Sequence, residues 1–143
     1  MTSRAKRPDL AAMLAPLMRE LIAAELPVLQ KHGLSMWGYS VLITLDQSPV
    51  RTQAALAEAI GADKSRIIPV LDELETQGLI RRHPDPEDRR VRLLEITAEG
   101  RAAKDATQVA IQRGEEKWLQ KLQADDRRTF LRVLVQLASE PDQ

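Results

Sequence analysis

The most regular apolar pattern along the chain lies in two short segments that a tight turn joins. In the first, residues 52–60, Leu56, Ala59 and Ile60 share one helical face. Gly61 follows, where a left-handed residue commonly ends a helix. In the second, four apolar residues are spaced i, i+3, i+4 and i+7: Ile67, Val70, Leu71 and Leu74. This spacing predicts a second helix with one face in a core, and the pair predicts a helix-turn-helix unit.

Polar residues with capping ability stand at the starts of the expected helices. Thr52 can accept hydrogen bonds from free backbone N–H groups of the first helix, Asp63 from those of the second, and Asp125 from those of a last helix. Gly78 is a stop signal after the second helix. Pro69 lies inside that helix and removes one backbone hydrogen bond. We expect the helix to bend there and to continue, because the missing N–H is on the solvent side.

Two strand-like runs follow the helices, at residues 79–83 and 91–96, and the second has a preference for period-two alternation. Pro84 and Pro86 stand between the runs and oppose helix in the loop. A hairpin directly after a helix-turn-helix predicts a mainly α (α+β) fold. Its centre is a winged helix-turn-helix core over residues 34–97, with a two-stranded β-hairpin as the wing.

The two ends of the chain predict long helices that are apolar on more than one side, over residues 9–30 and 98–139. A helix with two apolar faces needs two surfaces to pack against, and in an isolated domain of this size one of the two faces would remain exposed to water. We therefore expect residues 1–143 to form one domain whose terminal helices mediate a two-fold homodimer. Pro27 can end the first helix early, and Gly114 can bend the long helix near the C-terminus.

Short and basic side chains occupy the face of the second helix that lies opposite its apolar stripe. The face comprises Ser65, Pro69, Asp72 and Thr76, with Lys64 and Arg66 on its flanks. A helix that enters the major groove of DNA needs close approach, donors near bases and phosphates, and exposed N-terminal N–H groups. We expect Lys64, Ser65 and Arg66 to contact phosphates and base edges, and Pro69 to lie against the same groove. Thr52 and Gln53 would touch the DNA backbone.

The loop of the hairpin carries charged residues at its tip. Arg89 and Arg90 stand there, and an arginine on a hairpin tip can enter a narrow minor groove, where the potential is most negative. Asp88 can orient the Arg90 guanidinium through a bidentate pair. The acids Asp85, Glu87 and Asp88 leave a second interpretation open, in which the loop is a solvated charged hairpin with local salt bridges.

Three segments, in their order and spacing, go beyond a bare helix-turn-helix: AALAEAIGADKSRIIPVLDELETQGLIRR, then DPEDRR, then LEITAEGR. Together they resemble the MarR (multiple antibiotic resistance regulator) family of winged-helix transcription factors. The resemblance implies a homodimeric regulator that binds a pseudo-palindromic operator in double-stranded DNA, usually as a repressor. It also implies a response to a small-molecule effector. Pro69 departs from the family, which has a polar or basic residue there.

The resemblance places the effector near the first two helices and the winged domain. Four residues of this region are candidates: His32, Met36, Trp37 and Tyr39. Met36 and Trp37 are also explained as core residues, which is the interpretation we favour, and His32 as a solvated turn residue. The chain has four aromatic residues in all, Trp, Tyr and Phe together, so a dedicated aromatic cage is not expected.

The overall charge keeps a second hypothesis open. The chain has 21 acidic and 21 basic residues, whereas a DNA-binding protein usually shows a basic footprint. Between residues 79 and 92, however, five arginines stand against three acids. The alternative is a winged-helix module for dimerisation or protein interaction that has no operator of its own.

Other classes of protein have no support in the sequence. The sequence contains no nucleophile paired with a general base, no phosphate-binding glycine loop and no cluster of metal ligands. We therefore expect no enzymatic activity, cofactor or metal. The absence of cysteine excludes disulfides, cysteine-ligated zinc and a thiol redox switch. No apolar run approaches a membrane span, and the first residues lack the apolar region of a signal peptide. We therefore expect a cytoplasmic protein without a membrane partner.

Overall fold

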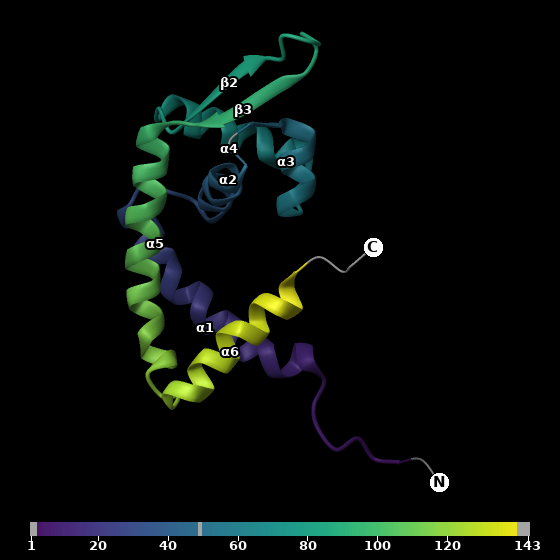
Figure 1. Ribbon diagram of the computed structural model, residues 1–143, viewed down its shortest axis with the longest axis vertical. Helices are drawn as coiled ribbons and strands as arrows, with labels where there is room; N and C mark the ends of the chain where they lie inside the picture. Colours follow the sequence, from purple (N-terminus) through teal and green to yellow (C-terminus); the bar gives the residue numbers. More distant parts are fainter. Residues whose placement is uncertain (1–2, 49, 140–143) are drawn as a thin grey trace.

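The computed structural model describes residues 3–48 and 50–139 of the chain. The elements follow in the order α1 (Leu10–Lys31), α2 (Met36–Gln47), β1 (Val50–Thr52), α3 (Gln53–Ile60), α4 (Lys64–Thr76), β2 (Ile80–Pro84), β3 (Arg92–Ile96), α5 (Ala98–Leu119) and α6 (Ala124–Ala138). Helix α5 runs from the sheet at one end of the molecule to the region where α1 and α6 cross at the other (Figure 1). The mainly α winged helix-turn-helix fold is thus confirmed.

The turn between α3 and α4 forms as its residue types require. The Thr52 hydroxyl oxygen accepts a hydrogen bond of 3.1 Å from the backbone N–H of Ala55, which caps α3. Gly61 ends α3 at φ 71°, in the left-handed region that glycine adopts without strain. Asp63 is the N-cap residue of α4, but its carboxylate makes no capping hydrogen bond. Likewise α6 has Gln123 and not Asp125 as its N-cap, so that prediction is wrong.

The helices continue through their internal prolines. Helix α1 extends past Pro27 to Lys31, so the prediction of an early end is wrong, and α4 continues through Pro69 as expected. A proline removes the donor for the carbonyl four residues earlier, here those of Ala23 and Ser65. Both of these residues are exposed, so water can replace the missing N–H. Helix α5 also continues through Gly114.

The sheet contains one strand more than the expected hairpin. Strands β2 and β3 form the antiparallel hairpin, with Arg82 opposite Leu94. Strand β1 pairs with the other edge of β3, also antiparallel, so the strand order is β1-β3-β2. Three residues are too few to show an alternating pattern, and β1 forms because β3 offers a free edge to it. The chain that enters α3 is thereby joined to the wing.

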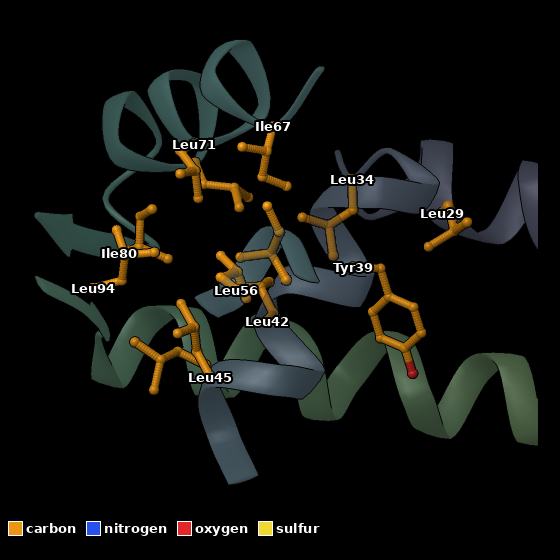
Figure 2. Packing of buried hydrophobic residues seen from close by; sticks show 14 of the residues in the cluster. Leu29, Leu34, Tyr39, Leu42, Leu45, Leu56, Ile67, Leu71, Ile80 and Leu94 are labelled. Atoms are coloured by element: carbon orange, nitrogen blue, oxygen red, sulfur yellow. The ribbon is translucent and has the colours of Figure 1, made fainter. Parts of the chain in front are cut away.

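The core lies between the helix-turn-helix, the sheet and α2. Figure 2 shows Ile67 and Leu71 of α4 pointing inward, toward Leu42 of α2 and the sheet residues Ile80 and Leu94. All five of these side chains are at most 1% exposed. Close packing of this cluster fixes α4 against the wing and leaves the opposite face of α4 free.

The terminal helices contribute little to this core. Among the described residues, α1 buries only Leu29 and α6 buries none. Large apolar side chains are instead exposed on α1, at Leu10, Met13, Leu14, Met18, Ile22 and Leu26, and on α6, at Leu131, Leu134, Val135 and Leu137. An apolar surface this extensive is typical of an interface with another protein chain.

Helix α5 approaches the end of the winged unit at Gly100. A Cβ atom added at Gly100 would lie 2.0 Å from the carbonyl oxygen of Leu79 and 2.9 Å from Cγ1 of Ile96. We expect Gly100→Ala to lower the free energy of unfolding by about 1–3 kcal/mol or more, because overpacking forces the backbone apart. Urea denaturation at one fixed protein concentration measures this loss.

Gly114, in the same helix, provides the matched control. Nothing lies within 4 Å of the position that a Cβ would take there. Gly114→Ala is therefore expected to leave the stability unchanged or to raise it by up to about 1 kcal/mol, since alanine favours helix over glycine. Equal effects of the two substitutions would contradict the close approach of α5 to Leu79.

Candidate nucleic-acid interface

The N-terminal turn of α4 presents the predicted groove-contacting residues to solvent. Lys64, Ser65 and Arg66 are all exposed. The backbone N–H groups of Arg66 and Ile67 donate to the Asp63 carbonyl. In the described part of the chain, those of Lys64 and Ser65 have no recorded acceptor. Free N–H groups at the positive end of a helix dipole are well suited to bind a phosphate.

The start of α3 lies beside a polar cleft. Gln53 lines this cleft, of about 320 Å³, together with Glu75 of α4 and Arg82 and Arg92 of the sheet. Thr52 precedes Gln53, and its oxygen accepts the capping hydrogen bond, so its O–H proton can be donated elsewhere. The two residues expected to touch the DNA backbone therefore lie close to the exposed side of both α4 and the wing.

A cluster of ions joins α4 to the wing, and the sequence did not predict it. Nη2 of Arg82 lies 2.5 Å from Oδ1 of Asp72 and 3.1 Å from Oε1 of Glu75. The backbone N–H of Arg82 donates to the other Glu75 oxygen at 3.2 Å. The hydrogen bond from Arg82 lowers the pKa of the Glu75 carboxyl, and it also keeps the Arg82 pKa raised. The cluster holds β2 against α4 and reduces the negative charge on the exposed side of α4.

The wing tip is an ordered turn with exposed arginines. The Arg90 side chain is 92% exposed, and its Nε lies 3.3 Å from Oδ1 of Asp88. The same oxygen accepts from the Arg90 backbone N–H at 3.1 Å. The bidentate pair is therefore a wrong prediction: one carboxylate oxygen makes both contacts. This geometry orients the guanidinium and leaves its terminal nitrogens without a recorded partner among the described residues.

The acidic residues of the wing loop mainly hold its backbone. Oδ1 of Asp85 accepts from the backbone N–H of Glu87 at 2.9 Å, and the Asp85 N–H donates to the Val91 carbonyl at 2.9 Å. Arg89 is exposed and has no recorded ion pair within the part of the chain that the structure describes. In a hairpin stabilised by local salt bridges, the acidic side chains would pair with the arginine side chains. Here they mostly accept hydrogen bonds from the backbone, which favours arginines that are available to a partner.

The four residues expected at an effector site lie around the junction of α1 and α2. His32 is the C-cap residue of α1 and is half-buried, and Trp37 of α2 is half-buried as well. Met36 packs against the core, and Tyr39 lies within it and is only 8% exposed. Burial, and then the charge of Glu25, raise the pKa of the Tyr39 hydroxyl. Figure 2 shows the Tyr39 ring pointing away from the other core residues, toward α5.

An apolar cavity of about 270 Å³ lies elsewhere, between α1, α5 and α6. Its lining includes Met18 of α1, Trp118 of α5 and Phe130 of α6. Glu115 also lines it, and burial raises the pKa of this carboxyl. None of the four predicted effector residues lines this cavity.

An ion-pair network connects α5 to the winged unit. Asp46 of α2 lies 2.8 Å from Nε of Arg101 and 2.6 Å from Nζ of Lys104. Hydrogen bonds from Lys104 and Arg101 lower the pKa of Asp46. Helix α5 also packs against α1, so the network attaches α2 to a helix that contacts α1.

The helices within residues 3–48 and 50–139 do not include one whose length and apolar character would let it span a membrane. In the same residues, no group of three or more histidine, cysteine, aspartate or glutamate side chains could hold a metal ion.

Comparison with known proteins agrees with this geometry. A family model of the MarR family matches residues 34–91. A putative transcriptional regulatory protein for the hcr operon of Thauera aromatica is 33% identical over 106 residues, which cover 74% of this chain and 64% of that protein. The transcriptional regulator HosA of Escherichia coli O111:H- is 31% identical over 110 residues, which cover 77% of this chain and 78% of HosA.

Among solved structures, the transcriptional repressor CouR bound to a 23-mer DNA duplex matches with a TM-score of 0.79 and 28% identity. The match covers 96% of this chain and all of that one. CouR from Rhodococcus jostii RHA1 bound to p-coumaroyl-CoA matches with a TM-score of 0.75 and 27% identity, over 99% of both chains. By sequence and by fold, this chain belongs to the MarR family of transcriptional regulators.

Proposed function

We propose that this chain is a sequence-specific DNA-binding regulator that represses transcription as a homodimer. The observation that carries the proposal is the pairing of an exposed, basic α4 N-terminus with an exposed wing-tip arginine, Arg90, on one rigidly packed unit. Helix α4 enters the major groove, where Lys64, Ser65 and Arg66 contact phosphates and base edges. Arg90 and Arg89 reach the adjacent minor groove. The likeness to CouR, whose structure is solved on DNA, supports this arrangement.

The dimer is supported by the exposed apolar faces of α1 and α6. Residues 34–97 carry DNA contacts in this proposal, and residues 9–30 and 98–139 carry the contacts between the two protomers, within one domain of residues 1–143. A two-fold dimer presents two α4 helices, so its operator is a pseudo-palindrome whose half-sites lie about one helical turn apart. A dimer bound over a promoter blocks transcription.

A small molecule regulates the dimer in this proposal, as the p-coumaroyl-CoA complex of CouR suggests by analogy. Its candidate site remains the region of His32, Met36, Trp37 and Tyr39, close to the α1–α2 junction. A ligand that favours one spacing of the two α4 helices changes DNA affinity by its differential binding to the two states. The protein is proposed to act in the cytoplasm, without enzymatic activity.

Selection from random and genomic duplexes on the purified protein tests the proposal. The enriched duplex is then titrated by fluorescence anisotropy at two salt concentrations. We expect one enriched palindrome, bound at least about a thousandfold more tightly than bulk DNA. If only weak, salt-sensitive and sequence-independent binding is found, the proposal fails and the chain is an interaction module without its own operator.

A further inference from the structure

One large apolar side chain is exposed on the winged unit. Among the described side chains between residues 34 and 97, Ile68 of α4 is the large hydrophobic residue with a substantial exposed area, 44%. The others lie on α1, α5 and α6 and on the loop between α5 and α6. Pro69, which follows Ile68, is also exposed. These two residues form a small apolar surface, the Ile68–Pro69 patch, that is separate from the apolar faces of the terminal helices.

The patch lies on the side of α4 that faces away from the core. Ile67 and Leu71 point into the core, as Figure 2 shows, and Ile68 is turned away from them by its place on the helix. Ile68 follows Lys64 by four residues, and Pro69 follows Ser65 by four, so each lies one turn beyond a predicted DNA-contacting residue.

The side chains available on this part of α4 restrict which bases it can read. Between residues 67 and 76 there is no arginine, lysine, asparagine or glutamine, the side chains that recognise guanine or adenine through paired hydrogen bonds. The other polar side chains of this stretch are engaged elsewhere. Arg82 holds the Asp72 and Glu75 carboxylates at 2.5 Å and 3.1 Å. The Thr76 hydroxyl donates to the Asp72 carbonyl at 2.9 Å. Glu73 lines a pocket beside Gly33 and Leu34. Ile68 and Pro69 are the exposed apolar residues of this stretch, and the apolar feature of a base edge in the major groove is the C5-methyl group of thymine.

We propose that the Ile68–Pro69 patch recognises thymine methyl groups in each operator half-site and so determines part of the sequence specificity. This inference rests on the proposed DNA-binding function. A patch of two side chains is far smaller than the apolar surfaces that mark protein interfaces. It adjoins the exposed cationic residues Lys64 and Arg66, which favour a polyanion as the occupant.

Uracil substitution in the operator tests the inference. Each thymine of the selected duplex is replaced in turn by uracil, which pairs in the same way and lacks only the methyl group. Anisotropy titrations are made with the wild-type dimer and with Ile68→Ala, Pro69→Ala and Ile68→Val. We expect uracil at one or two positions per half-site to weaken wild-type binding by about fourfold, and by about fifteenfold in both half-sites together, from the value of a buried methyl group.

The penalty must depend on the patch. Ile68→Ala or Pro69→Ala is expected to abolish it at these positions, and Ile68→Val to retain part of it. Val109→Ala, at an exposed apolar position of α5, is the matched control and keeps the full penalty. The inference is overturned if the operator binds tightly but uracil causes no penalty, or if the Ile68 and Pro69 variants leave the penalty unchanged. Either result leaves the proposed DNA-binding function intact. If no duplex is selected at all, the proposed function fails together with the inference.

Discussion

Arg90→Ala is expected to weaken operator binding more than any other single substitution in the wing. The Arg90 side chain is 92% exposed and contacts only Asp88 among the described residues, so its removal costs the fold little. An arginine that contacts DNA is worth about 1–3 kcal/mol, and a dimer has two such wings, so we expect a loss in affinity of at least about thirtyfold. The slope of affinity against salt concentration should also become shallower.

Anisotropy with the selected operator measures this loss, and circular dichroism verifies that the fold is intact. Arg4→Ala is the matched control, because Arg4 is an exposed arginine outside both the winged core and residues 9–30 and 98–139. It removes the same charge from each protomer and is expected to change operator affinity less than about threefold. Equal losses for the two variants would mean that net charge, and not the place of Arg90 at the wing tip, governs binding.

Val135→Glu is expected to convert the dimer into monomers. Val135 is 70% exposed, and α6 buries no residue in the described protomer. A glutamate at that position therefore costs little in an isolated chain. In a two-fold dimer that covers α6, two carboxylates would lose their water, at an effective cost of several kcal/mol each, on the order of the penalty for a buried ion.

Sedimentation at micromolar concentration distinguishes the two states of the protein. The wild type should sediment as a dimer and Val135→Glu as a folded monomer, with operator affinity reduced to that of a single half-site. Gln47→Glu places the same charge at an exposed polar position at the end of α2, outside residues 9–30 and 98–139, and should remain dimeric. A Val135→Glu protein that remains dimeric would show that the α6 face at this position does not lie between protomers.

The helix-turn-helix was predictable because its signals are local. The apolar spacing from Ile67 to Leu74 defines one face of α4 within two turns, and Thr52 and Gly61 act on backbone groups within a few residues. The candidate site followed from the same spacing, since the residues opposite the apolar stripe must be exposed. Ile68 was overlooked because it lies beside the stripe in sequence, although its angle on the helix could have separated it from the core.

Contacts between distant segments were not predictable in the same way. Strand β1 depends on an edge of β3 more than forty residues later, where Arg51 pairs with Leu94. The Arg82 cluster requires α4 and β2 to be packed together before its carboxylates can meet. Pro27 predicts a helix end because it lacks a backbone N–H. Helix α1 nevertheless continues to Lys31, because the turns on both sides of Pro27 keep their hydrogen bonds and water can bind the carbonyl that lost its donor.

Residue spacing and backbone preference alone therefore determined the helices, the hairpin, the exposed face of α4 and the excess of apolar surface at both ends of the chain. These properties depend on interactions over a few residues, which the order of side chains specifies directly. The tertiary structure decided the third strand, the attachment of the wing to α4 through Arg82, and the single-oxygen contact between Asp88 and Arg90. Each of these depends on distances and orientations that exist only once the core has closed, so no local pattern contains them.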